Sequence, residues 1–119
     1  MQAVALALTA LVALVHVGVV VLETALWDTP RGRAVFRMSR EQAAATKVLA
    51  ANQGLYNGFL VAALVLGLLG PEEHRAAFSV FGLGCVLVAG VFGAATVSPR
   101  ILLVQTVPAA LALGAWALS

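Results

Sequence analysis

The stretch "AVALALTALVALVHVGVVVLETAL", residues 3–26, decides the class of this protein. It carries one acid, one histidine and no Lys or Arg, and its length is close to the roughly 17–25 apolar residues that cross a bilayer as an α-helix. It also exceeds the roughly 7–15 apolar residues of a signal peptide, and no basic residue precedes it. We therefore expect a transmembrane helix here rather than a cleaved leader.

Three further apolar runs follow, at about 44–69, 76–97 and 101–118. Hydrophobic residues make up 62% of the 119 residues and charged residues only 10%, whereas a soluble domain has about 25% charged residues. We predict an all-α, polytopic membrane protein whose single domain, residues 1–119, is a four-transmembrane-helix bundle in the lipid bilayer. The net charge of +2 is too low to indicate nucleic-acid binding.

The basic residues predict the orientation of the chain. They cluster between the first two runs and are sparse elsewhere, and those in the connections are Arg31, Arg33, Arg37, Arg40, Arg75 and Arg100. Because cytoplasmic connections carry an excess of Lys and Arg, we place the first and third connections in the cytoplasm and both termini on the non-cytoplasmic side. Trp27 and Trp116 would then lie at the two membrane interfaces, where tryptophan is enriched.

Local signals mark the start of the second helix. The sequence "SREQ" at 39–42 is typical of a capping box, in which Ser39 caps the helix and Gln42 reaches back to the backbone. The preceding "DTPRGRAVFRM", residues 28–38, contains a Pro-Arg-Gly turn and then apolar residues among arginines. Two interpretations stay open for this segment, a stretch lying on the inner membrane surface and an ordinary basic loop.

Polar residues inside the apolar runs indicate a functional site. Such groups cost several kcal/mol in hydrocarbon unless they are satisfied, so they usually face the interior of a bundle. With a rise of about 1.5 Å per residue, polar residues from three runs fall at similar depths in the cytoplasmic half. His16 and Glu23 also share one helix face, which Thr9 extends. We predict one ligand-binding pocket lined by His16, Glu23, Asn52, Gln53, Tyr56, Asn57 and Gln105.

Small residues predict where helices approach closely. Gly54 and Gly58 have the GxxxG spacing, and Gly82 and Gly93 lie on a small-residue face of the third run. Pro108 is expected to kink the last helix beside Gln105. The single cysteine gives no CxxC motif, and we predict no metal ligands.

Several functions fit this pattern. The first is binding or transport of a small polar or cationic ligand, because an ionisable residue in a membrane helix marks such sites. The alternative is a membrane-embedded enzyme that uses Glu23 and His16, about 10.5 Å apart along the helix, as acid and base. A metal or haem protein stays open as well, with His16 as one axial ligand and a homodimer supplying a second. A helper that assembles with larger partners is a fourth possibility, and the sequence names no cofactor.

Several segments together resemble a known family. They are "H-x6-E-x3-W" (His16, Glu23 and Trp27), "WDTPRGRAVF", "ATKVLAANQGLYNGFL", "GVFGAATV" and "QTVPAALAL". With these segments the chain resembles a bacterial family of small four-helix integral membrane proteins of unknown function, and "NQGLYNGFL" is the most specific part. The resemblance covers nearly the whole chain and implies the four-helix fold and a multi-pass location in the bacterial inner membrane. It supplies no substrate.

Overall fold

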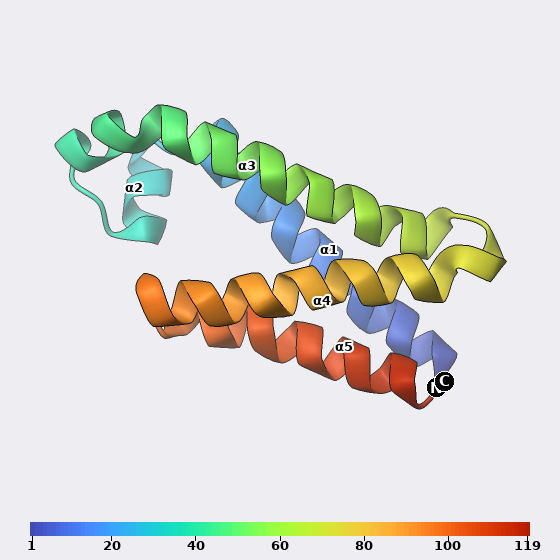
Figure 1. The fold of residues 1–119 in the computed structure, drawn as a ribbon. Coiled ribbons are helices and arrows are strands. Elements are labelled where there is room, and N and C mark those ends of the chain that lie inside the picture. The colour runs from blue at the N-terminus through green and yellow to red at the C-terminus, as the bar shows by residue number, and fades with distance from the viewer. The chain divides into compact units, whose positions relative to one another are not determined.

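A computed structural model describes all 119 residues, and the protein is all-α, as predicted (Figure 1). It has five α-helices and one π-helical segment. In chain order these are α1 (Gln2–Thr24), α2 (Pro30–Phe36), α3 (Arg40–Leu69), α4 (Glu72–Thr96), η1 (Leu102–Thr106) and α5 (Val107–Ala117).

Three of these helices, α1, α3 and α4, are long and apolar enough to cross a membrane. They indicate a multi-pass membrane protein that lies in a lipid bilayer. The last apolar run forms the shorter helical stretch Leu102–Ala117. At about 1.5 Å per residue this stretch is roughly 24 Å long, less than the roughly 30 Å of bilayer hydrocarbon. The fourth span and the side of the termini therefore stay predictions.

The start of α3 is stabilised by the capping box that the sequence predicted. The Ser39 backbone N–H donates to Gln42 Oε1 at 3.0 Å, and the Gln42 N–H donates to Ser39 Oγ at 3.1 Å. These two reciprocal bonds form the capping box, so they satisfy N–H groups that the first turn of a helix leaves without partners.

The segment before α3 forms a short helix, α2, in place of the expected Pro-Arg-Gly turn, and both interpretations of this segment, a stretch on the membrane surface and a basic loop, stay predictions. Thr29 caps it, because its Oγ1 accepts a hydrogen bond from the Gly32 N–H at 3.2 Å. Pro30 occupies the first turn, where a missing N–H costs nothing. The helix ends at Arg37, which adopts the left-handed conformation with φ 54°.

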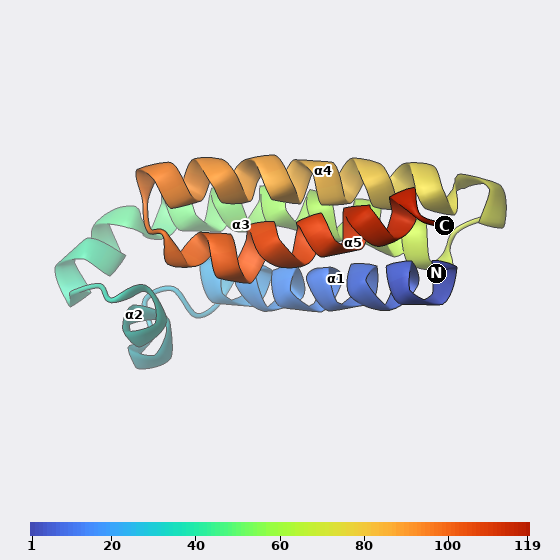
Figure 2. The ribbon, with the colours of Figure 1, turned by 90° about the horizontal axis from the view of Figure 1, so that it is seen from below.

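The chain forms two compact units, and the first comprises Met1–Val15 and Leu60–Ser119. In this unit α4 and α5 lie side by side, and the two termini lie at the same end (Figures 1 and 2). Its core comes from α1, α3, α4 and α5 and consists of Ala5, Val12, Ala13, Leu64, Leu83, Val86, Ala109, Ala112, Ala115 and Trp116. Trp116, which we expected at a membrane interface, is thus buried in this core.

Two buried hydroxyls in the first unit lie over glycines. Ser79 Oγ and Thr106 Oγ1 have no hydrogen-bond partner. A Cβ added to Gly67 would collide with Ser79 Oγ, and one added to Gly90 would collide with Thr106 Oγ1. Each hydroxyl therefore occupies the space that a side chain at the facing glycine would fill, and Cα–H···O contacts of this kind recur between helices.

A widened turn precedes Pro108. The Val107 N–H donates to the Leu102 carbonyl, five residues earlier, and this bond belongs to η1. Pro108 has no N–H to offer the Val104 carbonyl. The irregularity predicted beside Gln105 is therefore a π-helical turn that contains this residue.

The second unit comprises His16–Phe59. It holds the C-terminal part of α1, all of α2 and the N-terminal two-thirds of α3. Six of the seven predicted pocket residues belong to it.

Candidate functional site

A carboxylate and an amide meet in the second unit. Glu23 lies in the last turn of α1, and its residue is only 6% exposed. Asn57, on α3, donates a hydrogen bond from Nδ2 to Glu23 Oε1 at 2.6 Å. A short hydrogen bond to a carboxylate is among the stronger ones in proteins, so it holds these two side chains together.

Gly54 allows α1 and α3 to approach at this point. Its backbone is buried, and an added Cβ would lie 2.5 Å from Thr24 Cγ2 and 3.2 Å from Glu23 Cβ. Ala50, one turn earlier on α3, is only 2% exposed. Small residues at this four-residue spacing let two helix backbones come close, and Asn57 then reaches Glu23 from the same side of α3.

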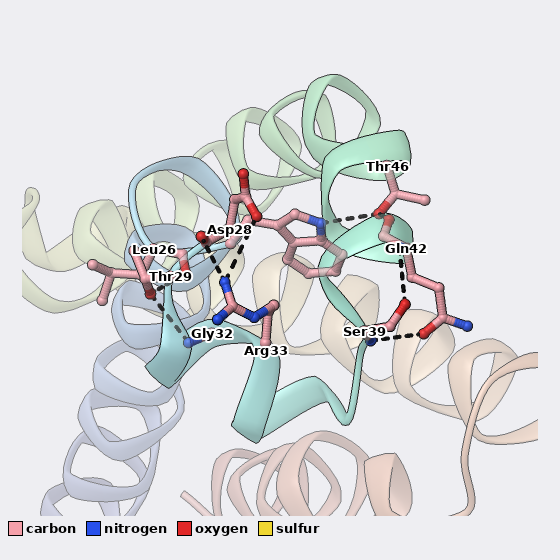
Figure 3. A network of polar contacts seen from close by, with 9 residues as sticks. Leu26, Asp28, Thr29, Gly32, Arg33, Ser39, Gln42 and Thr46 are labelled. Atoms are coloured by element: carbon pink, nitrogen blue, oxygen red, sulfur yellow. Dashed lines mark hydrogen bonds and ion pairs between the residues drawn. The ribbon is translucent and has the colours of Figure 1, made fainter.

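A second pair of side chains fixes the end of α1 in the same unit. Trp27 Nε1 donates to Thr46 Oγ1 at 3.0 Å, and Thr46 Oγ1 donates to the Gln42 carbonyl at 2.7 Å. Figure 3 shows Thr46 and Gln42 on α3, next to the Ser39 cap. Because Thr46 and Asn57 are eleven residues apart, about three helical turns, both lie on one face of α3.

The polar stripe predicted on α1 is confirmed. Thr9, His16 and Glu23 are 0%, 1% and 6% exposed. They are spaced by seven residues, which is about two turns, so a single buried face of α1 carries all three. His16 and Glu23 are therefore buried polar groups on a candidate membrane span.

The remaining polar residues of "ANQGLYNGFL" lie elsewhere on α3. Asn52, Gln53 and Tyr56 are exposed, and the Tyr56 ring makes an edge-to-face contact with Phe59 at 5.6 Å between centroids. At about 100° per residue, Asn57 is roughly 60° around α3 from Gly54, whereas Asn52 and Tyr56 are roughly 160° away. The face of α3 that packs against α1 therefore includes Asn57, whereas Asn52, Gln53 and Tyr56 lie on other faces.

Gln105 belongs to the first unit, where it lies in η1. Its Cβ would be 3.1 Å from a Cβ on Gly90. Gln105 and the Glu23–Asn57 pair therefore belong to different units of the protein.

The predicted packing glycines differ in their surroundings. A Cβ on Gly82 would be 2.9 Å from Leu64 Cδ2, and one on Gly93 would be 3.1 Å from Ile101 Cδ1. Gly58, in contrast, has nothing within 4 Å of that position. The close approach to α1 in the second unit is therefore at Gly54, with buried Ala50 one turn earlier, and Gly58 takes no part in it. The four-residue spacing of small residues at 50 and 54 is the sequence signal for it.

The charge around Glu23 is one-sided. The last turn of α1 contains this acid and no basic residue. The C-terminus of a helix carries a partial negative charge, so an anionic side chain there is unfavourable by about 0.3–1 kcal/mol. A positive charge placed beside Glu23 would be favoured by both the carboxylate and the helix end.

One surface groove contains none of the predicted pocket residues. This groove, of about 340 Å³, lies on α4 and is lined by His74, Ala77, Phe78 and Phe81. No three His, Cys, Asp or Glu side chains are grouped so that they could hold a metal ion. The donor set at Glu23 is one carboxylate and one amide.

Comparison with known proteins gives one match. Residues 10–117 match the model of the family described as "Protein of unknown function (DUF1304)". No curated protein and no solved structure matches the chain. The matched region includes α2 to α5 and Glu23, Gly54 and Asn57. The chain therefore belongs to the DUF1304 family.

Proposed function

We propose that this protein is an integral membrane protein that binds a small cationic ligand at Glu23 and Asn57. One observation carries the proposal, the 2.6 Å hydrogen bond from Asn57 Nδ2 to the buried Glu23 carboxylate between two candidate membrane spans. An ionisable residue within such a helix is costly and therefore points to a functional role.

The ligand should be a cation because the site lacks positive charge. Asn57 is a neutral donor, and the last turn of α1 supplies no base. A carboxylate buried without a charged partner or further donors is expensive in an apolar environment. A bound cation would offset that cost, and it would also interact favourably with the negative end of α1.

Asn57 has a second function in this proposal. An amide that donates through Nδ2 still has its carbonyl oxygen as an acceptor. Glu23 and Asn57 thus offer oxygen atoms from two helices, which suits an ammonium group or a hard metal cation. His16, two turns along the same buried face of α1, would border the path of such a ligand.

The proposed contacts are narrower than the pocket expected from the sequence. Asn52, Gln53 and Tyr56 are exposed side chains, and Gln105 lies in the other unit. We therefore assign the direct ligand contacts to Glu23 and Asn57 alone.

A binding experiment tests this function. Protein purified in a non-ionic detergent is titrated with sodium, magnesium, guanidinium and tetramethylammonium chlorides, and binding is followed by calorimetry. Glu23→Gln keeps the side-chain shape and removes the charge. The matched control is Glu73→Gln, an exposed acid in the first turn of α4.

We expect at least one cation to bind the wild-type protein, with an affinity at least tenfold lower in Glu23→Gln and unchanged in Glu73→Gln. Circular dichroism verifies that both variants are folded. The proposal is wrong if none of the four cations binds, or if Glu23→Gln binds them as the wild type does.

A further inference from the structure

The connection between α1 and α3 presents basic and apolar side chains together. Arg31, Arg37 and Arg40 are exposed, and Val35 is 53% exposed. Arg33 differs from these, because it lies 3.9 Å from Asp28 Oδ1 and donates to the Asp28 carbonyl at 3.1 Å. Figure 3 shows this pair beside the cap of α2. The three exposed arginines therefore give the outer side of this connection its positive charge.

Helix α2 is held in place by its inner side. Gly32 is buried, and a Cβ there would collide with the carbonyls of Leu26 and Trp27. Phe36 packs against the Trp27 ring with 4.7 Å between centroids. Trp27 also donates a hydrogen bond to Thr46 on α3. Through Trp27, helix α2 is therefore connected to α3 as well as to the end of α1. Its outer side is thus a preformed surface.

Exposure together with spacing defines an outer side of α2. Arg31 and Val35 are both exposed and four residues apart, so they share a face that lies about 60–100° around the helix from buried Gly32. Arg37 follows in the left-handed conformation that ends the helix. Arg31 and Val35 thus place a cation and an apolar group one turn apart, and Arg37 adds a second cation. Such a combination suits the boundary between lipid headgroups and acyl chains.

The position of α2 in the chain places it at a membrane surface. It lies between the end of α1 and the start of α3, and both of these are candidate spans. From Asp28 to Glu41 the segment has four arginines and two acids, a charge of +2. Anionic lipids attract such juxtamembrane basic residues, with a gain of about fivefold in affinity for each charge.

We propose that the outer side of α2 is a binding site for anionic phospholipids. Arg31 and Arg37 contact the lipid phosphates, and Val35 enters the acyl boundary. The proposal does not rest on the cation site at Glu23, since no residue is shared between the two.

Lipid titration of the intact protein tests this inference. The protein in non-ionic detergent is mixed with phosphatidylglycerol or phosphatidylcholine of the same chain length, and native mass spectrometry measures the bound lipid. The test variant is Arg31→Gln/Arg37→Gln. The matched variant Arg31→Lys/Arg37→Lys keeps both charges, and Arg100→Gln removes an exposed arginine from another connection.

We expect the wild-type protein to prefer phosphatidylglycerol, with weaker binding at high salt because exposed charges are screened. The double glutamine variant should lose at least about fivefold in affinity for this lipid, the gain that one basic residue makes beside anionic lipids, and should bind phosphatidylcholine as before. The double lysine variant and Arg100→Gln should stay within about threefold of the wild type.

Equal binding of the two lipids by the wild-type protein would overturn the proposal without any variant. So would an unchanged preference in the double glutamine variant. A polyglutamate peptide that binds this surface while the lipids do not would assign it to an acidic protein partner and would equally overturn the lipid site.

Discussion

The Trp116 indole donates a hydrogen bond to Thr9 Oγ1 at 3.0 Å and so joins two residues that are 107 positions apart. Thr9 in turn donates to the Ala5 carbonyl at 2.8 Å. Both Thr9 and Trp116 are buried, so this chain of bonds connects α5 to α1 inside the core of the first unit. The indole N–H of Trp116 thus has its hydrogen-bond partner within the protein, as a buried tryptophan usually does.

Replacing Thr9 should test this bond. Thr9→Val keeps the shape but leaves the buried indole N–H without an acceptor, and we expect a loss of about 1 kcal/mol in the free energy of unfolding. Thr9→Ser keeps the hydroxyl and is the control. Thermal unfolding in detergent, followed by circular dichroism, measures both. Equal midpoints for the two variants would show that the bond adds little.

Gly54 and Gly58 form a matched pair for a packing experiment. Gly54→Ala should lower the unfolding midpoint, because its Cβ would be 2.5 Å from Thr24 Cγ2 and 3.2 Å from Glu23 Cβ, so both side chains would have to give way. Gly58→Ala has open space and should be neutral or raise stability by about 0.5–1 kcal/mol through helix propensity. Thermal unfolding of both variants decides, and a stable Gly54→Ala would contradict the close approach.

Asn57 should matter for stability, whereas Asn52 should not. Asn57→Ala removes the donor to the buried Glu23 carboxylate, and a cost of about 1–3 kcal/mol is expected for a polar group left unpaired. Asn52 is exposed, so Asn52→Ala should stay within about 0.5 kcal/mol of the wild type. Chemical unfolding measures the difference. A larger effect at Asn52 would mean that its exposed face is the functional one.

Gly32 offers a test of α2 that uses an intrinsic probe. Gly32→Ala would collide with the Leu26 and Trp27 carbonyls, so we expect α2 to shift and the environment of Trp27 to change. The tryptophan emission of the purified protein should therefore alter. Gly18→Ala, which meets nothing within 4 Å, should leave the emission unchanged. If both variants fluoresce as the wild type does, α2 is not held as described.

The predicted orientation can be tested on cells. A cysteine at exposed Ala34, in a Cys85→Ala background, should react with a membrane-impermeant maleimide only after the cells are permeabilised. The reason is the excess of arginines in this connection. Ready labelling of intact cells would reverse the assignment of both termini.

Much of the fold was predictable because its causes are local. The apolar run 3–26 and the capping box of Ser39 and Gln42 need only neighbours in sequence, and both gave the observed helices α1 and α3. Helix α2 was missed for the opposite reason. Gly32 serves there as the point of contact with Leu26 and Trp27, and a Pro-Arg-Gly sequence by itself equally favours a turn.

The candidate site was predictable on α1 but less so on α3. The seven-residue spacing of Thr9, His16 and Glu23 predicts that they share one face of α1, and all three are buried. On α3 two rules compete, since both polar residues and small residues tend to face other helices in a membrane. In this protein Ala50 and Gly54 determine the inward face, and Asn57 is the polar residue that remains close to it.

The hydroxyls that lie over glycines have a consequence for how this sequence can vary. A methyl group at Gly67 would collide with the Ser79 hydroxyl and, even without that hydroxyl, would lie 2.8 Å from the Ser79 backbone N. Position 67 should therefore stay glycine in relatives that keep this packing. At Gly90 only the Thr106 hydroxyl lies closer than 3.1 Å to such a methyl group, so alanine at position 90 is expected together with glycine or alanine at position 106.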